Sequence, residues 1–212
     1  NISVWNRVSD EKNGYYRKHY WGPIHLAERC NHTKWSVLRY PNDAMAQLAG
    51  MSTEEYEDFY FAACLVDYDK MGKAMEKLEA LMDRTDKVHI LGPGTDITFS
   101  IKGIPCYGMH GNKNIPDGEV YTAPVRESVN GVITYNTPAP YDGFVYQNVK
   151  LVFKDGKIVE CSSNNTDRMN KIFDIDEGAR YVGEFAFGVN PQIHRAIGDI
   201  LFDEKIAGSF HL

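Results

Sequence analysis

Residues 88–97 (VHILGPGTDI) mark the point at which the chain changes from helical to strand patterns. Residues 88–91 read as a short strand, a Gly-Pro-Gly turn follows, and residues 97–101 are a second strand candidate. Before this stretch the chain is charged and methionine-rich, and after it glycine, proline and β-forming residues dominate. We therefore expect an α+β (α/β-like) fold, with a mainly helical domain over residues 1–86 and a mixed, β-rich domain over residues 87–212.

Helix signals cluster in the first part. Ser52 and Glu55 form a capping box, in which each side chain can accept a hydrogen bond from the other residue's backbone N–H. Apolar residues then recur at helical spacing, which predicts one buried face: Tyr56, Phe59, Tyr60 and Ala63. Residues 43–48 are expected to form a short helix closed by Gly50. Residues 68–82 are expected to form a further helix, whose methionine stripe fills the core.

Short strands joined by tight turns are expected in the second part. Asp155-Gly156 lies between two β-forming runs and predicts a two-residue hairpin. Residues 181–187 are expected to form a strand that carries Glu184. Pro191 is expected to open a helix that continues towards Ile200.

Composition excludes several classes of protein. The 23 Lys and Arg residues against 29 Asp and Glu give a net charge of −6 without a basic stripe, which argues against nucleic-acid binding. The four cysteines stand far apart, so neither a zinc knuckle nor a secreted disulfide framework is indicated. No apolar run approaches the ~18 residues of a membrane span, and the first residues do not resemble a signal peptide. We expect a cytoplasmic protein without a membrane partner.

Common catalytic signatures are missing from the sequence. The glycine loop at residues 92–94 matches neither phosphate-binding pattern, and a strand follows it where such loops need a helix. The Gly-x-Ser-x-Gly elbow of serine hydrolases is absent. The His-Glu-x-x-His signature of zinc proteases is absent as well.

Four residues stand out as candidate metal ligands. Glu119 follows a tight Asp-Gly turn, Glu184 interrupts an apolar run, and His211 follows small residues that permit close backbone approach. Each also has a structural interpretation: an exposed glutamate beside a turn, a salt-bridged glutamate, and an ordinary histidine. Glu204 could add a carboxylate or belong to a solvated helix end. Carboxylates and an imidazole from separate segments are the ligands that hold divalent transition metals in hydrolases.

Three ordered motifs carry a resemblance to a known family: residues 114–124 (NIPDGEVYTAP), 183–186 (GEFA) and 200–211 (ILFDEKIAGSFH). Upstream stretches agree with it at residues 37–41, 49–52 and 88–103. The chain resembles the thermophilic-aminopeptidase family of metallopeptidases from about Trp35 onward.

The resemblance implies a homodimeric exopeptidase that uses two divalent metal ions, cobalt, zinc or magnesium, to release N-terminal residues from peptides. Glu119 and Glu184 match the family's first two glutamate ligands, and His211 matches its first histidine ligand. Glu204 matches a further family carboxylate. In the family a tyrosine follows that histidine shortly, and a His-x-Asp pair supplies the last ligands; these positions would follow Leu212.

We therefore expect an internal fragment of a metalloaminopeptidase, because the chain opens on Asn1 and ends one residue after His211. The resemblance then implies that residues 1–86 end an N-terminal domain and residues 87–212 begin the catalytic domain. The alternative is a non-catalytic α+β structural or dimerisation fragment without bound metal. A phosphoesterase is less well supported, because Asp/His-rich clusters and basic phosphate clamps are missing.

Overall fold

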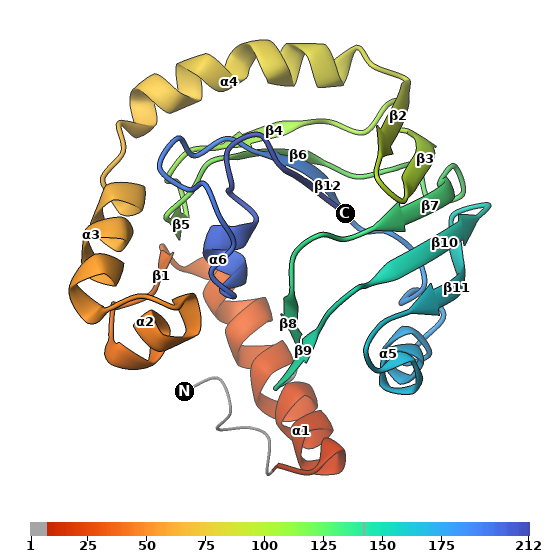
Figure 1. Ribbon diagram of the computed structural model, residues 1–212, viewed down its shortest axis with the longest axis horizontal. Coiled ribbons are helices and arrows are strands. Elements are labelled where there is room, and N and C mark those ends of the chain that lie inside the picture. Colours follow the sequence, from red (N-terminus) through yellow and green to blue (C-terminus); the bar gives the residue numbers. More distant parts are fainter. Residues whose placement is uncertain (1–7, 142) are drawn as a thin grey trace.

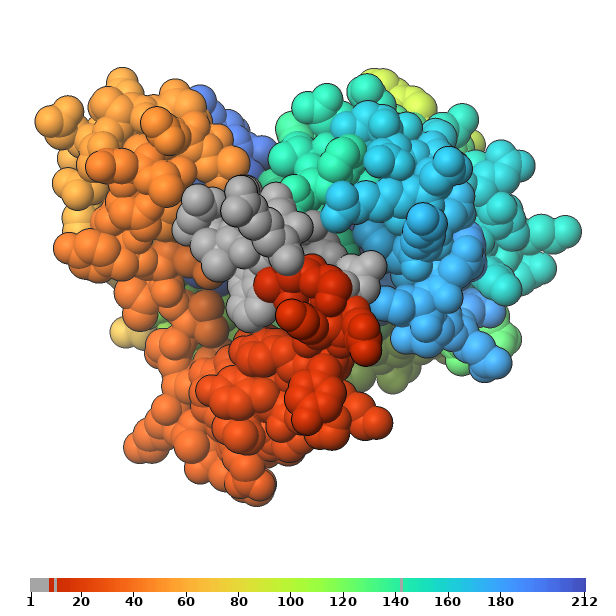
Figure 2. Space-filling view, turned by 90° about the horizontal axis from the view of Figure 1, so that it is seen from below, coloured from red at the N-terminus to blue at the C-terminus, as the bar shows by residue number. Residues whose placement is uncertain are grey.

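The computed structural model describes residues 8–141 and 143–212, and Figure 1 shows their arrangement. A helical segment opens the described chain: α1 (Asp10–Tyr16) runs into the π-helix η2 (Arg17–Cys30). No residue of η2 is buried, and in Figure 2 this segment, red to orange, projects from the rest of the molecule. Within the described residues, no helix is both long enough and apolar enough to cross a bilayer.

Three further helices follow where the caps predict them: α2 (Asp43–Ala49), α3 (Thr53–Cys64) and α4 (Tyr68–Asp83). Gly50 ends α2 in the left-handed conformation, with φ 67°. Both halves of the predicted capping box are present, since Ser52 accepts from the Glu55 N–H and Glu55 accepts from the Ser52 N–H. Met71, Met75 and Met82 of α4 are buried, which confirms the methionine stripe as core.

Most strands belong to two antiparallel sheets. The five-stranded sheet has the order β11-β10-β7-β3-β2 and is formed by β2 (Lys87–Gly92), β3 (Thr95–Ser100), β7 (Asn130–Thr134), β10 (Lys150–Lys154) and β11 (Lys157–Ser162). The four-stranded sheet has the order β13-β12-β6-β4 and is formed by β4 (Tyr107–Met109), β6 (Glu119–Thr122), β12 (Phe185–Gly188) and β13 (Phe210–His211). The predicted hairpin between β10 and β11 is confirmed, and both turn residues, Asp155 and Gly156, have positive φ as its turn type requires.

Two small sheets and two short helices complete the fold. β1 (Val37–Leu38) pairs with β5 (Asn114–Ile115) in parallel, and β8 (Ala139–Tyr141) pairs with β9 (Phe144–Tyr146) in antiparallel. The remaining helices are α5 (Thr166–Phe173) and α6 (Ile200–Asp203).

Two hydrophobic clusters hold these elements together. In the first, the buried face of α4 packs on β4 and β6, and Figure 1 shows α4 arching over this sheet. In the second, α2 and α3 surround Phe202 and its neighbours in the last part of the chain. Burial of a side chain such as Phe202 stabilises the fold by about 1.5–3 kcal/mol. Residues from both sides of the predicted boundary share each cluster, and the division into residues 1–86 and 87–212 stays a prediction.

The predicted strand over residues 181–187 is wrong at its start. β12 begins only at Phe185, opposite Thr122 in β6, so Glu184 lies directly before the strand. After the end of β6 at Thr122 the chain continues with Ala123 and Pro124, and a proline has no backbone N–H to donate to a β-ladder. The ladder ends at the Phe185–Thr122 pair, and Glu184 lies just outside it.

The predicted helix from Pro191 to Ile200 is also wrong. Residues 191–192 form a turn, residues 193–199 are irregular with two bends, and α6 is only four residues long. Gly198 has φ 78°, and the Asp203 carboxylate accepts hydrogen bonds from the N–H groups of Ile197 and Gly198 at 2.7 and 2.9 Å. These two N–H groups are thus already hydrogen-bonded to a side chain, which competes with the backbone hydrogen bonds that a helix would give them.

Candidate metal centre

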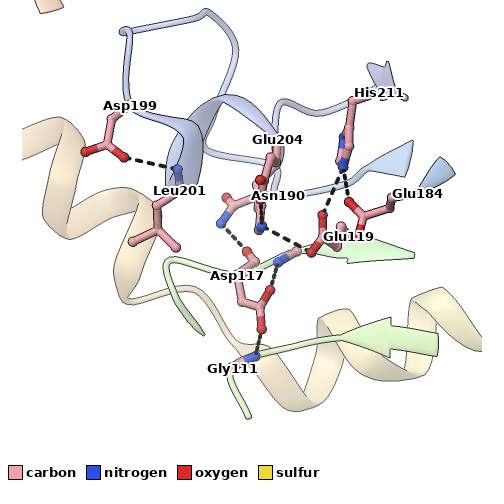
Figure 3. Close-up of polar contacts among 11 residues, drawn as sticks. Gly111, Asp117, Glu119, Glu184, Asn190, Asp199, Leu201, Glu204 and His211 are labelled. Atoms are coloured by element: carbon pink, nitrogen blue, oxygen red, sulfur yellow. Dashed lines mark hydrogen bonds and ion pairs between the residues drawn. The ribbon is translucent and has the colours of Figure 1, made fainter. Parts of the chain in front are cut away.

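Glu119, Glu184 and His211 converge on one point of the four-stranded sheet (Figure 3). One ligand atom from each residue lies within 4.8 Å of the others. His211 Nε2 lies 3.0 Å from Glu184 Oε1 and 3.4 Å from Glu119 Oε2. The prediction that these residues meet in space, although they are far apart in sequence, is confirmed.

Strand register brings the three segments together. Ala186 of β12 pairs with Tyr121 of β6 on one side and with His211 of β13 on the other. Directly paired residues share a face of the sheet, and residues two apart on a strand do the same. Glu119 therefore shares its face with Tyr121 and His211. Glu184 reaches the same point from the residue before β12.

A buried turn fixes the start of β6 and with it Glu119. The Asp117 carboxylate accepts hydrogen bonds from the N–H groups of Gly111 and Gly118 at 2.8 and 3.0 Å (Figure 3). Gly118 has φ 132°, and a Cβ there would lie 2.9 Å from the Cβ of Asn190. Asn190 in turn donates to the carbonyl oxygens of Asp117 and Ala63, at 2.8 and 3.0 Å. Asn190 thus ties the turn to helix α3. The Asp-Gly signal in the sequence predicted only the local shape of the turn.

The ionisable groups at the site shift one another's pKa. Burial raises the pKa of the Glu119 carboxyl, although the Lys205 ammonium lies 3.1 Å from its Oε1. Burial lowers the pKa of Lys205, but the Glu119 and Glu204 carboxylates more than offset this, and the pKa lies above the usual lysine value. We regard the pair as ionised, because the lysine has two carboxylate partners. The hydrogen bond from His211 lowers the pKa of Glu184, whose side chain keeps 45% of its surface exposed.

Two buried atoms of the cluster lack a hydrogen-bond partner among the described residues: Glu119 Oε2 and His211 Nδ1. Leaving a buried polar atom unpaired costs about 1–3 kcal/mol. A cation beside Glu119 Oε2 would satisfy that oxygen, and two carboxylates with one imidazole are a ligand set that divalent transition metals accept. The residues present therefore fit a metal ion.

Comparison with known proteins agrees with this chemistry. The model of the family "Thermophilic metalloprotease (M29)" matches residues 12–212. The chain belongs to this family. The match confirms the resemblance drawn from the three sequence motifs.

Among M29 relatives, aminopeptidase T of Thermus aquaticus is 30% identical in an alignment that covers 82% of this chain and 50% of that protein. Aminopeptidase 2 of Geobacillus stearothermophilus is 39% identical over 47% of this chain and 25% of that protein. The solved structure of wild-type AmpT from Thermus thermophilus matches with a TM-score of 0.83 and 26% identity, over 98% of this chain and 59% of that chain. The α+β fold is thereby confirmed. The chain spans about half the length of the aminopeptidase T sequences it matches.

Glu204, the fourth predicted ligand of this M29 chain, does not join the cluster of three. Its carboxylate instead contacts the Lys205 ammonium, which links it to Glu119. Its neighbour Asp203 is half-buried against the backbone of residues 197–198, and this partial burial raises the pKa of Asp203 to about 6. Glu204 is therefore linked to the cluster only through Lys205, whereas Asp203 binds the backbone before α6.

Lys205 and Asn190 are the residues at the site that sequence patterns missed. Both are fully buried. A lysine after Asp-Glu has the local pattern of a solvated helix end, and an asparagine before proline has the pattern of a turn. Only the third family-like motif, which contains Lys205, singled out this stretch of the chain.

Proposed function

We propose that the full-length protein containing this chain is a metal-dependent aminopeptidase that releases N-terminal amino acids from peptides. The observation that carries the proposal is the convergence of Glu119, Glu184 and His211, with the buried Glu119 Oε2 lacking a hydrogen-bond partner. Membership of the M29 metalloproteases and similarity to several aminopeptidases support it.

Glu119, Glu184 and His211 would hold a divalent metal ion. When bound, such an ion lowers the pKa of a coordinated water and polarises the scissile carbonyl. The protein residues fix the geometry: Glu119 is locked by its buried surroundings, and the β12–β13 pairing sets the position of His211. Glu184 is the most exposed of the three, so its carboxylate is the one that a positively charged peptide amino terminus would meet first.

A two-metal site needs more ligands than these three. The matched relatives are about twice as long as this chain, and we propose that the remaining ligands lie in the part of the protein beyond it. The use of cobalt, zinc or magnesium and the homodimer follow from the family resemblance and stay predictions. The cytoplasmic location, expected from the sequence composition, is also a prediction. Metal ligation by Glu204 stays a prediction as well, and would require its contact with Lys205 to change.

The test uses the full-length protein after removal of metal by a chelator. Cobalt, zinc or magnesium is added back, and release of leucine from a leucyl peptide is measured beside the same peptide with an acetylated amino terminus. We expect metal-dependent release from the free peptide only. Cleavage without metal, or equal cleavage of the acetylated peptide, would contradict the proposal, and absence of any cleavage would favour the non-catalytic alternative.

A further inference from the structure

Lys205 is a fully buried cation beside the candidate metal ligands. Its side chain has 0% of its surface exposed, and its ammonium lies 3.1 Å from Glu119 Oε1 and contacts Glu204 Oε2. Burial of a charge is costly unless the charge is paired and hydrogen-bonded. A positive charge placed next to a cation site also weakens the attraction for that cation. The two carboxylate partners offset the cost of burying the ammonium, but the repulsion between Lys205 and a bound cation remains to be explained.

The backbone holds Lys205 from two sides. Its carbonyl oxygen accepts from the Asn190 N–H at 3.1 Å, and its N–H donates to the Phe202 carbonyl at 2.9 Å. The segment crosses β12 at Gly188, where a Cβ would lie 2.8 Å from the Glu204 carbonyl oxygen and still closer to that of Ile206. The close approach that glycine permits here sets Lys205 directly over Glu119, which pairs with Gly188.

The two oxygens of Glu119 have different surroundings. Oε1 is held by the Lys205 ammonium, whereas Oε2 has no hydrogen bond and lies 3.4 Å from His211 Nε2. A carboxylate with one oxygen anchored cannot rotate freely or chelate with both oxygens. The second oxygen is thus fixed on the side where Glu184 and His211 gather.

We infer that Lys205 is a positioning residue: it anchors one oxygen of Glu119 so that the other faces the metal. This inference rests on the proposed function. Groups that orient metal ligands typically change metal affinity by about 10- to 100-fold when they are mutated. Lys205 acts through Glu119 and is not itself a ligand, because ammonium groups carry no free electron pair.

The sign of the effect makes the inference testable. If Lys205 only offset the repulsion between carboxylates, its removal would tighten metal binding, because a competing positive charge is lost. If it only supported the fold, its removal would lower stability and leave metal affinity unchanged. If it positions Glu119, its removal weakens metal binding although a positive charge has gone.

The experiment compares wild type, Lys205→Met and the exposed control Lys150→Met in the full-length protein. Zinc and cobalt affinity are measured by competition with a chromophoric chelator, the metal-free fold by circular dichroism and melting temperature, and kcat and KM with a leucyl peptide. We expect Lys205→Met to weaken metal affinity about tenfold or more and to lower kcat at saturating metal with little change in KM. The control should match wild type.

Unchanged or tighter metal binding by folded Lys205→Met, with wild type active, overturns the inference alone. A wild type that neither binds metal nor cleaves peptides overturns the proposed function and the inference with it. If Lys205→Met does not fold, Glu204→Gln replaces it, because it removes one of the two anchors of the ammonium. A loss of metal affinity in folded Glu204→Gln then supports the inference, and no loss or a gain overturns it.

Discussion

At the scale of single residues, the three clustered side chains differ in how much of the fold depends on them. Glu119 is buried and ion-paired with Lys205, so a change at Glu119 would affect both the candidate metal centre and the core. Glu184 is half-exposed, and its only described polar partner is His211. Function and stability can therefore be separated at Glu184 better than at Glu119.

Glu184→Gln in the full-length protein should lower kcat/KM for peptide hydrolysis by roughly 100-fold or more, since a ligand matters at least as much as the groups that orient it. The amide keeps the shape but loses the charge that holds the cation. The melting temperature of the metal-free protein should stay near that of wild type. Peptide assays and metal analysis check this against Glu160→Gln, an exposed glutamate of β11. Normal turnover with normal metal content would show that Glu184 is structural.

Asn190 links helix α3 to the turn that positions Glu119 in the candidate metal centre. Its side chain joins the Ala63 carbonyl of α3 to the Asp117 carbonyl of the turn before β6. Asn190→Ala should lower the free energy of unfolding by about 2–4 kcal/mol, because two buried carbonyl oxygens lose their donor. Urea unfolding measures the change, with the exposed Asn136→Ala as control. Equal stability of the two variants would show that water replaces the lost donor.

At the scale of elements, the crossing of residues 204–206 over β12 decides the shape of the site. Gly188 is paired with Glu119, and its N–H and carbonyl also bind Ser209 and Gly208 in the approach to β13. Gly188 thus contacts three segments: β6 with Glu119, residues 204–206 with Lys205, and the residues that lead into β13 with His211. A change of spacing here should move several site residues together.

Gly188→Ala should lower the free energy of unfolding by about 1–3 kcal/mol, as overpacking does in other cores. The added methyl group would meet the backbone of Glu204 and Ile206, which cannot rotate away as a side chain could. Gly183→Ala is the matched control, because a Cβ at Gly183 meets nothing within 4 Å. Chemical unfolding of both variants checks the prediction, and a similar loss in both would argue against the crossing as its cause.

At the scale of the whole molecule, two hydrophobic clusters each draw on distant parts of the chain. The first joins α4 to both large sheets, and the second joins α2 and α3 to residues 193–202. The strands that carry Glu119 and His211 are paired through β12, and residues of this chain pack around them. The number of ligands is not sufficient for a two-metal site.

The 212-residue chain by itself should not cleave a leucyl peptide, and excess cobalt or zinc should raise its melting temperature only slightly. Stabilisation by a ligand depends on how far its concentration exceeds Kd, and three ligands should bind weakly. Thermal melts with and without metal, beside a peptide assay, test this. A large metal-dependent rise in melting temperature together with cleavage would mean that the site functions with the residues present here.

Local chemistry was readable from the sequence where one segment contains all the interacting groups. The capping box at Ser52 and Glu55, the αL cap at Gly50 and the Asp155-Gly156 turn involve residues at most four apart, and all three are confirmed. Glu119, Glu184 and His211 were selected by their unusual local frames together with the order of the family-like motifs. The predicted helix after Pro191 failed because the Asp203 carboxylate, which is not part of a helix signal, takes up two of its N–H groups.

The sequence by itself determined most element types, the α+β class and the three residues that gather at the candidate centre. The tertiary structure alone decided where β12 begins, that Lys205 is buried, and which oxygen of Glu119 is left without a partner. The physical reason is range: caps and turns are satisfied within a few residues, whereas burial and strand register depend on segments far apart in the chain. Lys205 and Glu119 stand 86 positions apart by their numbers (205 − 119), and only the crossing over Gly188 brings their charges together.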